Sequence, residues 1–213
     1  MRRITGVALV LAGCLILAGC TTTGSPSDSG TGPSSASESP SATPVVATGL
    51  VVSLALIGVT ESDGSSGGSA DFSDGSKTMA LLSQVLGTPS MTRDDHYQTT
   101  SYDWGAVRLL IPDFTGAGLV QITAAEVKGL TVRTTQGIHV GSTVAEVQAA
   151  ASPGTENSPA GTPDTYYGLD ARPHPGTESL AFPGKVGSDF IEVHLVGGVV
   201  VGLRAPFGDW QDV

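Results

Sequence analysis

Residues 21–44 set the strongest limit on what this chain can fold into. Twenty of these twenty-four residues are Ser, Thr, Gly or Pro, and none is large and apolar. Such a segment cannot bury enough apolar surface to offset the entropy lost on folding, so we predict a disordered tether. The foldable part is then Val45 to Val213, which is enough chain for one well-buried domain or for two small repeats.

A short apolar run precedes the tether and ends in Leu17-Ala18-Gly19-Cys20. Two arginines, an apolar run and small residues before a cysteine form the pattern of a bacterial lipoprotein signal. We expect residues 1–19 to be a signal peptide that is removed by cleavage before Cys20. The segment 20–44 then begins with a lipidated cysteine, palmitate being among its acyl chains. These chains would hold the protein at the extracytoplasmic face of the cell membrane.

The same residues allow two alternatives to this cleavage site. An uncut transmembrane anchor would use Ile4 to Gly19, but sixteen residues fall short of the roughly 20 that cross a bilayer. Leu11-Ala12-Gly13-Cys14 repeats the same four letters, but cleavage there would leave a shorter apolar run. Cys14 and Cys20 are the only cysteines of the chain, so the foldable part has no thiol and no disulfide.

The balance of charges excludes two kinds of partner. The chain has 20 acidic and 10 basic residues, and loss of Arg2 and Arg3 with the signal leaves a net charge near −12. Binding to nucleic acid or to anionic lipid heads needs an excess of Lys and Arg. We therefore expect membrane attachment through the lipid anchor alone, and an envelope protein or a wall component as partner. Abundant Ala, Gly, Val and Thr beside few lysines indicate an actinobacterial type of envelope.

The first half of the foldable part reads as a strand, a loop, a helix and further strands. The β-branched run Leu50–Val59 predicts one largely buried strand, and Glu61–Gly75 predicts a Gly/Ser/Asp loop. Apolar residues at helical spacing predict a helix over Met79–Leu86, which Gly87 and Pro89 would end. Extended segments are expected at 99–104, 106–111 and 119–124.

The second half repeats this order. Leu130–Thr135 predicts a strand, and Thr143 with Glu146 forms a capping box that predicts the start of a short helix. Ser152-Pro153-Gly154 would end that helix, and Gly197-Gly198 predicts a tight hairpin. Further extended segments are expected at 165–169, 179–182, 189–196 and 199–204.

Short motifs recur in the two halves. Thr48-Gly49-Leu50-Val51-Val52 parallels Lys128-Gly129-Leu130-Thr131-Val132, and Gly75-Ser76-Lys77-Thr78 parallels Gly141-Ser142-Thr143 at the start of each helix. We predict an α+β fold made of two tandem helix-on-antiparallel-sheet repeats, over residues 45–127 and 128–213. The alternative is a single α+β domain whose two helices have similar caps.

These motifs also resemble those of a known family. The residues that carry the resemblance are Gly141-Ser142-Thr143-Val144-Ala145-Glu146-Val147, Leu86-Gly87-Thr88-Pro89 and Tyr102-Asp103-Trp104. The pattern is similar to the α/β repeat of secreted β-lactamase-inhibitor proteins and of the small lipoprotein of the outer-membrane barrel-assembly machine. The resemblance would cover roughly Leu50 to Arg204, and it implies recognition of a partner rather than catalysis.

No set of residues in the sequence converges on a catalytic pattern. Gly64-Ser65-Ser66-Gly67-Gly68 fits G-x-S-x-G, but this Gly/Ser run lacks the strand–turn–helix context of a hydrolase nucleophile. Asp94-Asp95-His96 could contribute to a metal site, yet no further ligand follows at a typical spacing. His139, His174 and His194 are expected in a turn, a proline-bounded loop and a strand face. We expect no enzyme activity, no cofactor and no metal site.

Four carboxylates of the predicted loop are candidate calcium ligands. They are Glu61, Asp63, Asp71 and Asp74. Calcium takes such oxygens readily, but their spacing does not match an EF-hand. A solvated acidic loop is the expectation, and calcium binding remains the alternative.

Aromatic residues are few, and six of them are candidates for an interaction surface. They are Tyr97, Tyr102, Trp104, Tyr166, Tyr167 and Phe190. Tyr and Trp supply contact area at low entropic cost, so those exposed on a sheet would form a binding patch. Tyr102 and Trp104 are two residues apart and share one face of a strand, which is either the core face or the open face of the sheet.

Together these expectations describe a non-catalytic protein-binding or envelope-assembly module, anchored to the membrane by lipid and carried on a flexible tether. The runner-up is an envelope hydrolase or a metal-dependent enzyme that acts on wall material. A small-ligand carrier is the third candidate. An enzyme would require polar groups that converge in one pocket.

Overall fold

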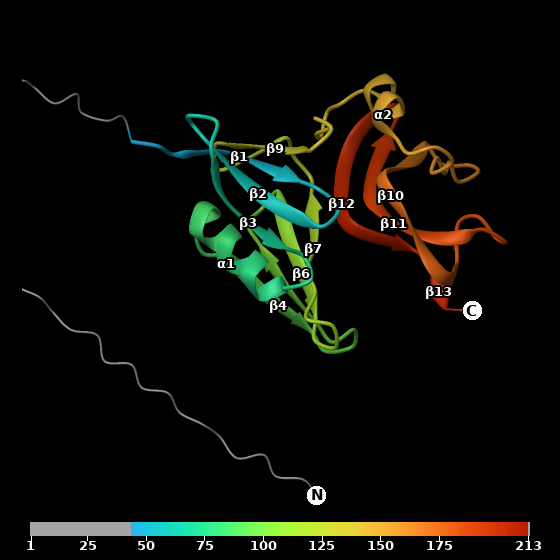
Figure 1. Ribbon diagram of the computed structural model, residues 1–213, viewed down its shortest axis with the longest axis horizontal. Helices are drawn as coiled ribbons and strands as arrows, with labels where there is room; N and C mark the ends of the chain where they lie inside the picture. Colours follow the sequence, from blue (N-terminus) through green and yellow to red (C-terminus); the bar gives the residue numbers. More distant parts are fainter. Residues whose placement is uncertain (1–43, 213) are drawn as a thin grey trace, which may run out of the picture. The chain divides into compact units, whose positions relative to one another are not determined.

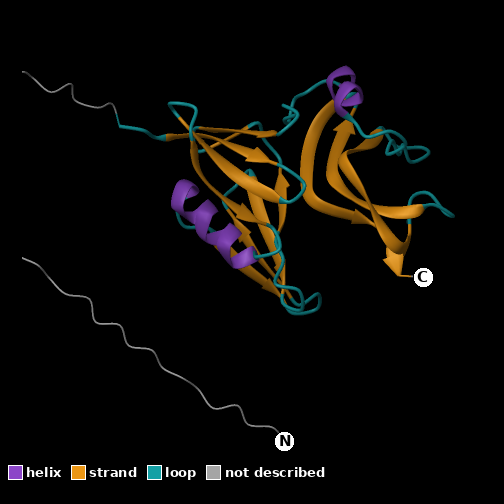
Figure 2. Cartoon of the chain, in the orientation of Figure 1, coloured by secondary structure: helices purple, strands orange, loops and turns teal. Residues whose placement is uncertain are grey.

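Most of the structured chain is β-sheet. The computed structural model describes residues 44–212, of which 50% lie in strands and 11% in helices (Figure 1; Figure 2). The predicted α+β class with two helix-on-sheet repeats is therefore wrong, and the fold is largely β. The error has two physical sources. Some segments without a strand-like residue pattern form strands, and the second helix is too short to cover a sheet.

The strands form two sheets. The five-stranded sheet has the order β3 (Ser66–Asp71), β2 (Leu56–Glu61), β1 (Ala47–Val52), β9 (Leu130–Thr134) and β8 (Glu126–Val127). One half of the eight-stranded sheet has the order β13 (Gln211–Asp212), β10 (Asp164–Glu178), β11 (Val186–Val196) and β12 (Val199–Asp209). The other half continues from β12 with β7 (Leu119–Ile122), β6 (Val107–Pro112), β5 (Thr99–Asp103) and β4 (Ser90–Asp94).

The first helix, α1 (Gly75–Leu86), confirms the prediction of a helix that ends at Gly87. Asp74 caps its start by accepting a hydrogen bond from the backbone N–H of Lys77 at 3.0 Å. The buried face of α1 packs against β3 and β6. Gly87 ends the helix with a φ of 77°, a left-handed conformation that glycine adopts without strain.

The second helix, α2 (Val144–Ala150), forms where the capping box predicts it. Thr143 Oγ1 accepts a hydrogen bond from the backbone N–H of Glu146, and Glu146 Oε2 accepts one from the backbone N–H of Thr143 at 2.7 Å. Seven residues rise only about 10 Å along a helix axis, and Val147 is the one buried residue of this helix. A helix of that length cannot cover a sheet whose longest strand has 15 residues.

The run Leu50–Val59, predicted as one strand, belongs to two. The strands β1 and β2 pair antiparallel, and the chain reverses between them at residues 53–55. Ser53 closes this turn: its N–H donates to Leu56 O over 2.9 Å, and its Oγ accepts from Leu56 N–H over 3.1 Å. No glycine or proline marks the reversal, which is why the apolar run reads as continuous.

The segment 61–75, predicted as a loop, contains strand β3. This strand pairs antiparallel with β2 and forms the edge of the five-stranded sheet beside α1. Its serines and glycines have low intrinsic preference for strands. Pairing with β2 and packing against α1 therefore decide the conformation of β3, rather than its own residues.

The hairpin predicted at Gly197-Gly198 is confirmed and joins the long strands β11 and β12. Both glycines have positive φ, 60° and 82°, as a type I′ turn requires. Two irregularities shift the register along this pair, and the one between His194 and Leu195 brings Glu192 opposite Arg204. An unbroken two-residue hairpin would have placed Glu192 opposite Leu203.

One hydrophobic core joins the two predicted repeats. Its buried residues form a single cluster that extends from Leu50 in β1 to Leu195 in β11. Three strand pairs cross the predicted boundary between residues 127 and 128: β1 runs parallel to β9, β8 pairs antiparallel with β9, and β7 pairs antiparallel with β12. The division into repeats stays a prediction. Residues 1–43, with the predicted signal peptide, Cys20 and nearly all of the tether, lie outside the described residues.

Candidate functional site

A groove with a volume of about 720 Å³ lies on the outer face of β10, β11 and β12. Two loops border it, residues 152–157 after α2 and residues 179–185 between β10 and β11, so the extended segment predicted at 179–182 is a loop. Leu169 and Ile191 face the opposite way and are buried, because successive side chains of a strand alternate between faces. The strand residues that line the groove floor include Tyr166, Phe190, Glu192, Arg204 and Phe207.

Glu192 and Arg204 form an ion pair on the groove floor. Nε and Nη2 of Arg204 both donate to Glu192 Oε1, Nε at 2.7 Å. Glu192 is only 6% exposed, so its charge would be costly to bury without this partner. The Arg204 guanidinium also lies over the ring of Phe207, with Cζ 4.4 Å from the ring centroid. These contacts hold the charged pair in a defined geometry beside an aromatic ring.

Two phenylalanines complete the apolar part of the floor. The ring centroids of Phe190 and Phe207 lie 5.6 Å apart with a tilt of 56°, within the range favoured for aromatic pairs. The Phe190 ring passes over Gly168 of β10, where a Cβ would lie 3.0 Å from Phe190 Cγ and 3.0 Å from Thr155 Cβ. Glycine at position 168 thus leaves room for both the ring and the bordering loop.

Hydrogen bonds hold both bordering loops against the sheet. Asp209 accepts from Ser179 Oγ at 2.6 Å and from the backbone N–H of Ala181 at 2.9 Å, which ties the β10–β11 loop to β12. Thr155 Oγ1 donates to Gly168 O at 3.1 Å and accepts from Gly168 N–H at 3.0 Å, which ties the other loop to β10. Because its borders are fixed in this way, the groove is pre-formed.

His174, expected in a proline-bounded loop, instead lies within strand β10 and pairs with one carboxylate. Its Nδ1 lies 2.9 Å from Asp189 Oδ2, and its ring stacks on Trp210 with centroids 4.3 Å apart. The Asp189 side chain is 37% exposed, so it is not the buried carboxylate that a catalytic histidine would use as its partner. Neither His174 nor Asp189 lines the groove.

Two other histidines are placed as the sequence predicts, and His96 lies in the turn between β4 and β5. His194 lies on a strand face, with Nε2 2.7 Å from Asp164 Oδ1, and its ring stacks on Tyr166. His139 is in a turn before α2. Among residues 44–212, no three His, Cys, Asp or Glu side chains gather as a metal site would require.

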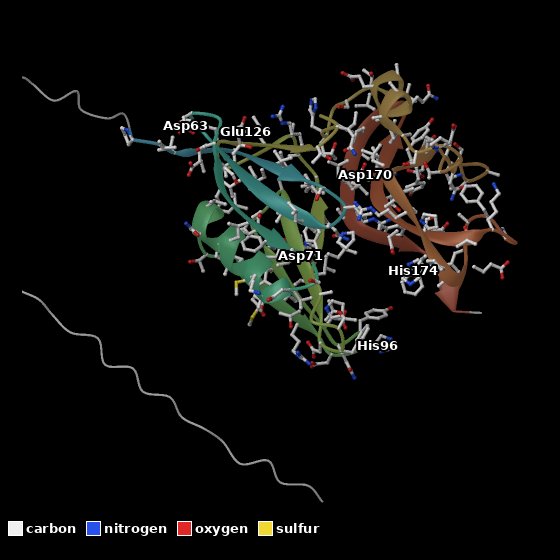
Figure 3. The ribbon with its side chains drawn as sticks, viewed as in Figure 1. Asp63, Asp71, His96, Glu126, Asp170 and His174 are labelled. Carbon is white, nitrogen blue, oxygen red and sulfur yellow. The ribbon has the colours of Figure 1, made fainter. Side chains whose placement is uncertain are left out.

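The carboxylates considered for calcium serve local turns. Hydrogen bonding from Ser65 lowers the pKa of Asp63, and hydrogen bonding from Ser73 lowers the pKa of Asp71. Asp63 precedes β3 and Asp71 is its last residue, so nearly the whole strand lies between the two carboxylates (Figure 3). The hydrogen bonds that Asp63 and Asp71 accept stabilise turns, which accounts for these two carboxylates.

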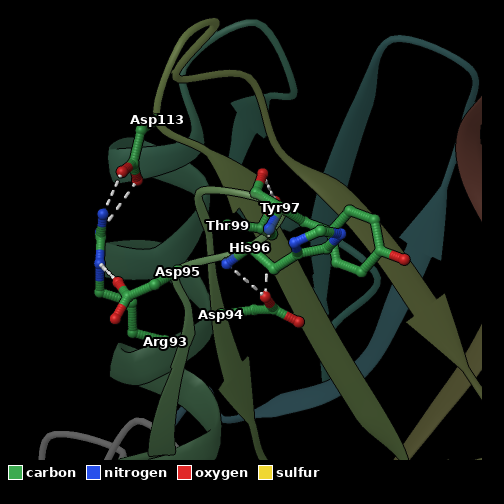
Figure 4. A network of polar contacts seen from close by, with 7 residues as sticks. All are labelled: Arg93, Asp94, Asp95, His96, Tyr97, Thr99 and Asp113. Carbon is green, nitrogen blue, oxygen red and sulfur yellow. Dashed lines mark hydrogen bonds and ion pairs between the residues drawn. The ribbon is translucent and has the colours of Figure 1, made fainter.

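Tyr97 lies at the tip of the β4–β5 hairpin, where a polar network fixes the turn (Figure 4). Arg93 donates to Asp95 Oδ1 at 2.7 Å and to Asp113 Oδ2 at 2.6 Å, which links this hairpin to the β6–β7 loop. Asp94 Oδ1 accepts from the backbone N–H of Tyr97 at 3.1 Å. The Tyr97 residue remains 70% exposed above this network.

Three of the six candidate aromatic residues belong to the core. Trp104 is buried, and its Nε1 donates to Gly87 O over 2.7 Å at the end of α1. Tyr167 is buried as well, and its hydroxyl accepts from Gln148 Nε2 at 3.0 Å. Tyr102 is half-buried and packs against the core. The structure thus places Tyr102 and Trp104 on the core side of the sheet, the first of the two alternatives left open by their spacing.

Three candidates, Tyr166, Tyr167 and Phe190, line the groove, and the structure adds three residues that the sequence did not single out. The signal that could have found them is the alternation of β11 and β12 on either side of the Gly197-Gly198 turn. Counting outward from that turn gives the wrong partners, because the two irregularities shift the register. The added residues are Glu192, Arg204 and Phe207.

Comparison with known proteins found no match to this chain. No family model, no curated protein and no solved structure matches the chain. Within residues 44–212, no helix has both the length and the apolar character needed to cross a membrane. The functional argument therefore depends on the groove and on the sequence motifs.

Proposed function

We propose that this protein is a lipid-anchored, extracytoplasmic binding module that recognises a component of the cell envelope through the groove on β10, β11 and β12. The observation that carries the proposal is the groove itself. It combines aromatic side chains with one ion pair and has borders held by hydrogen bonds. No catalytic step is part of the proposal.

The size and lining of the groove support a recognition site. Ligand-binding clefts commonly have volumes of about 300–1,000 Å³ and a mainly apolar lining with a few placed polar groups. The groove has that volume and that mixture. Aromatic residues and arginine are also the side chains that dominate binding energy at protein surfaces. A pre-formed groove needs little ordering on binding, which favours affinity.

The sequence supports the location. Acylation of Cys20 would hold the chain at the membrane, since each buried CH₂ contributes roughly 0.8 kcal/mol. A Gly/Ser-like tether of 24 residues has an r.m.s. span of roughly 27 Å and a fully extended length of about 80 Å. The groove could then search the zone between the membrane and the wall while the protein stays anchored.

Site-specific photo-crosslinking in cells tests the recognition role. A photoreactive residue at Leu180, which is exposed at the groove border, is expected to give a defined adduct with an envelope component. The same probe at Tyr97, on the β4–β5 tip, is the matched control. The Leu180 adduct should disappear in a folded Phe190→Ala/Phe207→Ala variant. Adducts that are equal at both probe positions, or unchanged in the variant, would contradict the proposal.

Fatty-acid labelling tests the anchor. Cys20→Ser is expected to abolish incorporation of labelled palmitate and to release the protein from the membrane fraction. Cys14→Ser, which changes the other cysteine, should incorporate label at the wild-type level. Loss of label in Cys14→Ser with retention in Cys20→Ser would move the lipidation site and contradict the Cys20 assignment.

A further inference from the structure

We propose that the ligand of this groove is a neutral oligosaccharide. The inference rests on the proposed function, because it names the ligand class of the same groove. Three properties of the floor point to it: an unpaired carboxylate oxygen, a balance of charges, and ring faces beside planar polar side chains.

The unpaired oxygen belongs to Glu192. Both hydrogen bonds from Arg204 end on Oε1, and no group among residues 44–212 donates to Oε2. No fully buried side-chain nitrogen or oxygen in the same residues lacks a partner, so Oε2 keeps contact with solvent although Glu192 is 94% buried. Glu192 Oε2 is therefore free to accept a hydrogen bond from a ligand that enters the groove.

Arg204 supplies donors beside this acceptor. Its Nη1 makes no hydrogen bond within residues 44–212, and its side chain is 38% exposed. Free N–H groups next to a free carboxylate oxygen match a pair of adjacent hydroxyls, each of which both donates and accepts. Hydrogen bonds to charged groups are the stronger kind, so this edge favours a polyhydroxylated ligand.

The charges of the groove lining favour a neutral ligand. Its two cationic side chains, Lys185 and Arg204, are balanced by two anionic ones, Glu192 and Asp209. An anionic ligand would meet the Glu192 carboxylate, and a cationic ligand would meet the Arg204 guanidinium. Either approach brings like charges together in a partly desolvated site, where the repulsion is weakly screened.

The aromatic residues supply apolar faces for sugar rings. Tyr166, Phe190 and Phe207 line the same groove as Glu192, Arg204 and Asn157. The C–H face of a pyranose is apolar and carries partial positive charge, which is complementary to the negative face of an aromatic ring. The equatorial hydroxyls of the same sugar point outward and can reach planar amide, carboxylate and guanidinium groups.

The position of the floor within the sheet argues against an extended peptide. A peptide that adds as a strand needs the unpaired backbone groups of a sheet edge. Here β11 pairs with β10 and β12 on its two sides, and β12 pairs with β11 and β7. On its side away from β11, β10 pairs with other segments only at Tyr166, Thr177 and Glu178. The part of the floor on β11 and β12, which carries Phe190, Glu192, Arg204 and Phe207, therefore offers side chains rather than a free backbone edge.

Isothermal titration calorimetry on the detergent-solubilised, lipidated protein tests the proposal. The probes are chitotetraose, cellotetraose and maltotetraose, which are neutral, together with tetragalacturonate, which is anionic, and an uncharged capped tetrapeptide. We expect saturable binding of at least one neutral oligosaccharide at one site per chain. Tetragalacturonate and the tetrapeptide should bind at least tenfold more weakly.

Variants locate the binding in the groove. Glu192→Gln is expected to weaken the oligosaccharide about tenfold or more, as loss of a charged hydrogen bond does. The matched control is Asp103→Asn, which alters the Arg108–Asp103 pair of β5 and β6. If Glu192→Gln does not fold, Phe190→Leu removes the ring face and keeps an apolar side chain, with Phe114→Leu as its control.

The outcomes separate the two proposals. The oligosaccharide proposal would be overturned if no neutral oligosaccharide binds, or if tetragalacturonate or the tetrapeptide binds more tightly. It would also be overturned if the folded groove variants bind the oligosaccharide as tightly as the wild type does. If the Leu180 photo-adduct still forms and still depends on Phe190 and Phe207, the recognition role stands with another ligand. If that adduct is absent as well, the recognition role fails too.

Discussion

At the scale of single residues, Glu192 and Arg204 form the charged centre of the groove. Each lies in a strand that the sequence predicts, but their pairing depends on the irregularity between His194 and Leu195, which shifts the register of β11 against β12. A bulge is stabilised by contacts across the sheet and leaves no clear local pattern. The charged centre of the groove was therefore out of reach of the sequence, whereas Tyr166 and Phe190 could be named from residue type.

Trp104 is expected to support the fold rather than binding. It is buried, and its indole N–H satisfies Gly87 O at the end of α1. Trp104→Ala should lower the free energy of unfolding by about 3–5 kcal/mol, as loss of a large core side chain does. Urea unfolding measures the change. Tyr97→Ala, at an exposed tip, should change it by about 0.5 kcal/mol or less, and an equal effect of the two variants would contradict this assignment.

At the scale of the element, local signals near helix ends and tight turns were reliable. The capping box of Thr143 and Glu146, the end of α1 at Gly87 and the turn at Gly197-Gly198 all form as predicted. Each depends on groups a few residues apart, which the sequence shows directly. The elements that were missed, β3 and the turn at Ser53, depend on pairing with distant residues or on a side-chain turn without glycine.

The capping box predicts a pH dependence of stability. Hydrogen bonds from Thr143 hold the pKa of Glu146 below its usual value of 4.5 in the folded protein. Since the folded pKa is the lower one, the contribution is fully present above pH 4.5 and is lost as the pH falls through the folded pKa. The stability difference between wild type and Glu146→Ala should shrink between pH 5 and pH 2, as measured by thermal unfolding. A difference that is constant over this range would contradict the prediction.

The long strands also depend on glycine where they meet Trp210. A Cβ at Gly187 would lie 2.2 Å from Trp210 Cβ and 2.9 Å from Asp209 O. Gly187→Ala should therefore destabilise the protein by about 1–3 kcal/mol, as overpacking does. At Gly202 of β12 the nearest atom to such a Cβ is 3.6 Å away, so Gly202→Ala is the matched control. Denaturant unfolding of the two variants should separate them, and equal midpoints would argue against the predicted clash.

At the scale of the whole molecule, the two halves share their sheets and their core. The pairs β1–β9 and β7–β12 cross the predicted repeat boundary, and one cluster of buried residues spans both halves. The eight-stranded sheet thus consists of two antiparallel meanders that meet at β7 and β12. Each half therefore supplies strands that complete the sheets of the other half.

The shared sheets predict that neither half folds alone. A chain that ends at residue 127 would leave β1 without β9 and β7 without β12, and both would become exposed edges. Its far-ultraviolet circular dichroism and amide NMR spectrum are expected to be those of an unfolded or aggregated chain. Mixing it with a chain that starts at residue 128 should restore the folded spectrum. A well-dispersed spectrum from either half alone would show two independent domains.

The sequence by itself determined the features that short stretches of residues encode. These are the tether composition, the lipoprotein signal pattern, the absence of cysteine from the foldable part, and the caps and turns named above. Such features depend on residue type and on spacing over a few positions, so no partner segment is needed to recognise them. They also carried the prediction of an extracytoplasmic binding role.

Only the tertiary structure decided the fold class and the groove. Serines and glycines became a strand because β2 lies beside them, and Trp104 entered the core because α1 and the sheet enclose it. The groove exists because three strands and two loops, from Ser152 to Asp209, converge on one face. Burial and strand pairing depend on residues that are far apart in the chain. Local patterns in a single sequence do not show which of these distant residues come into contact.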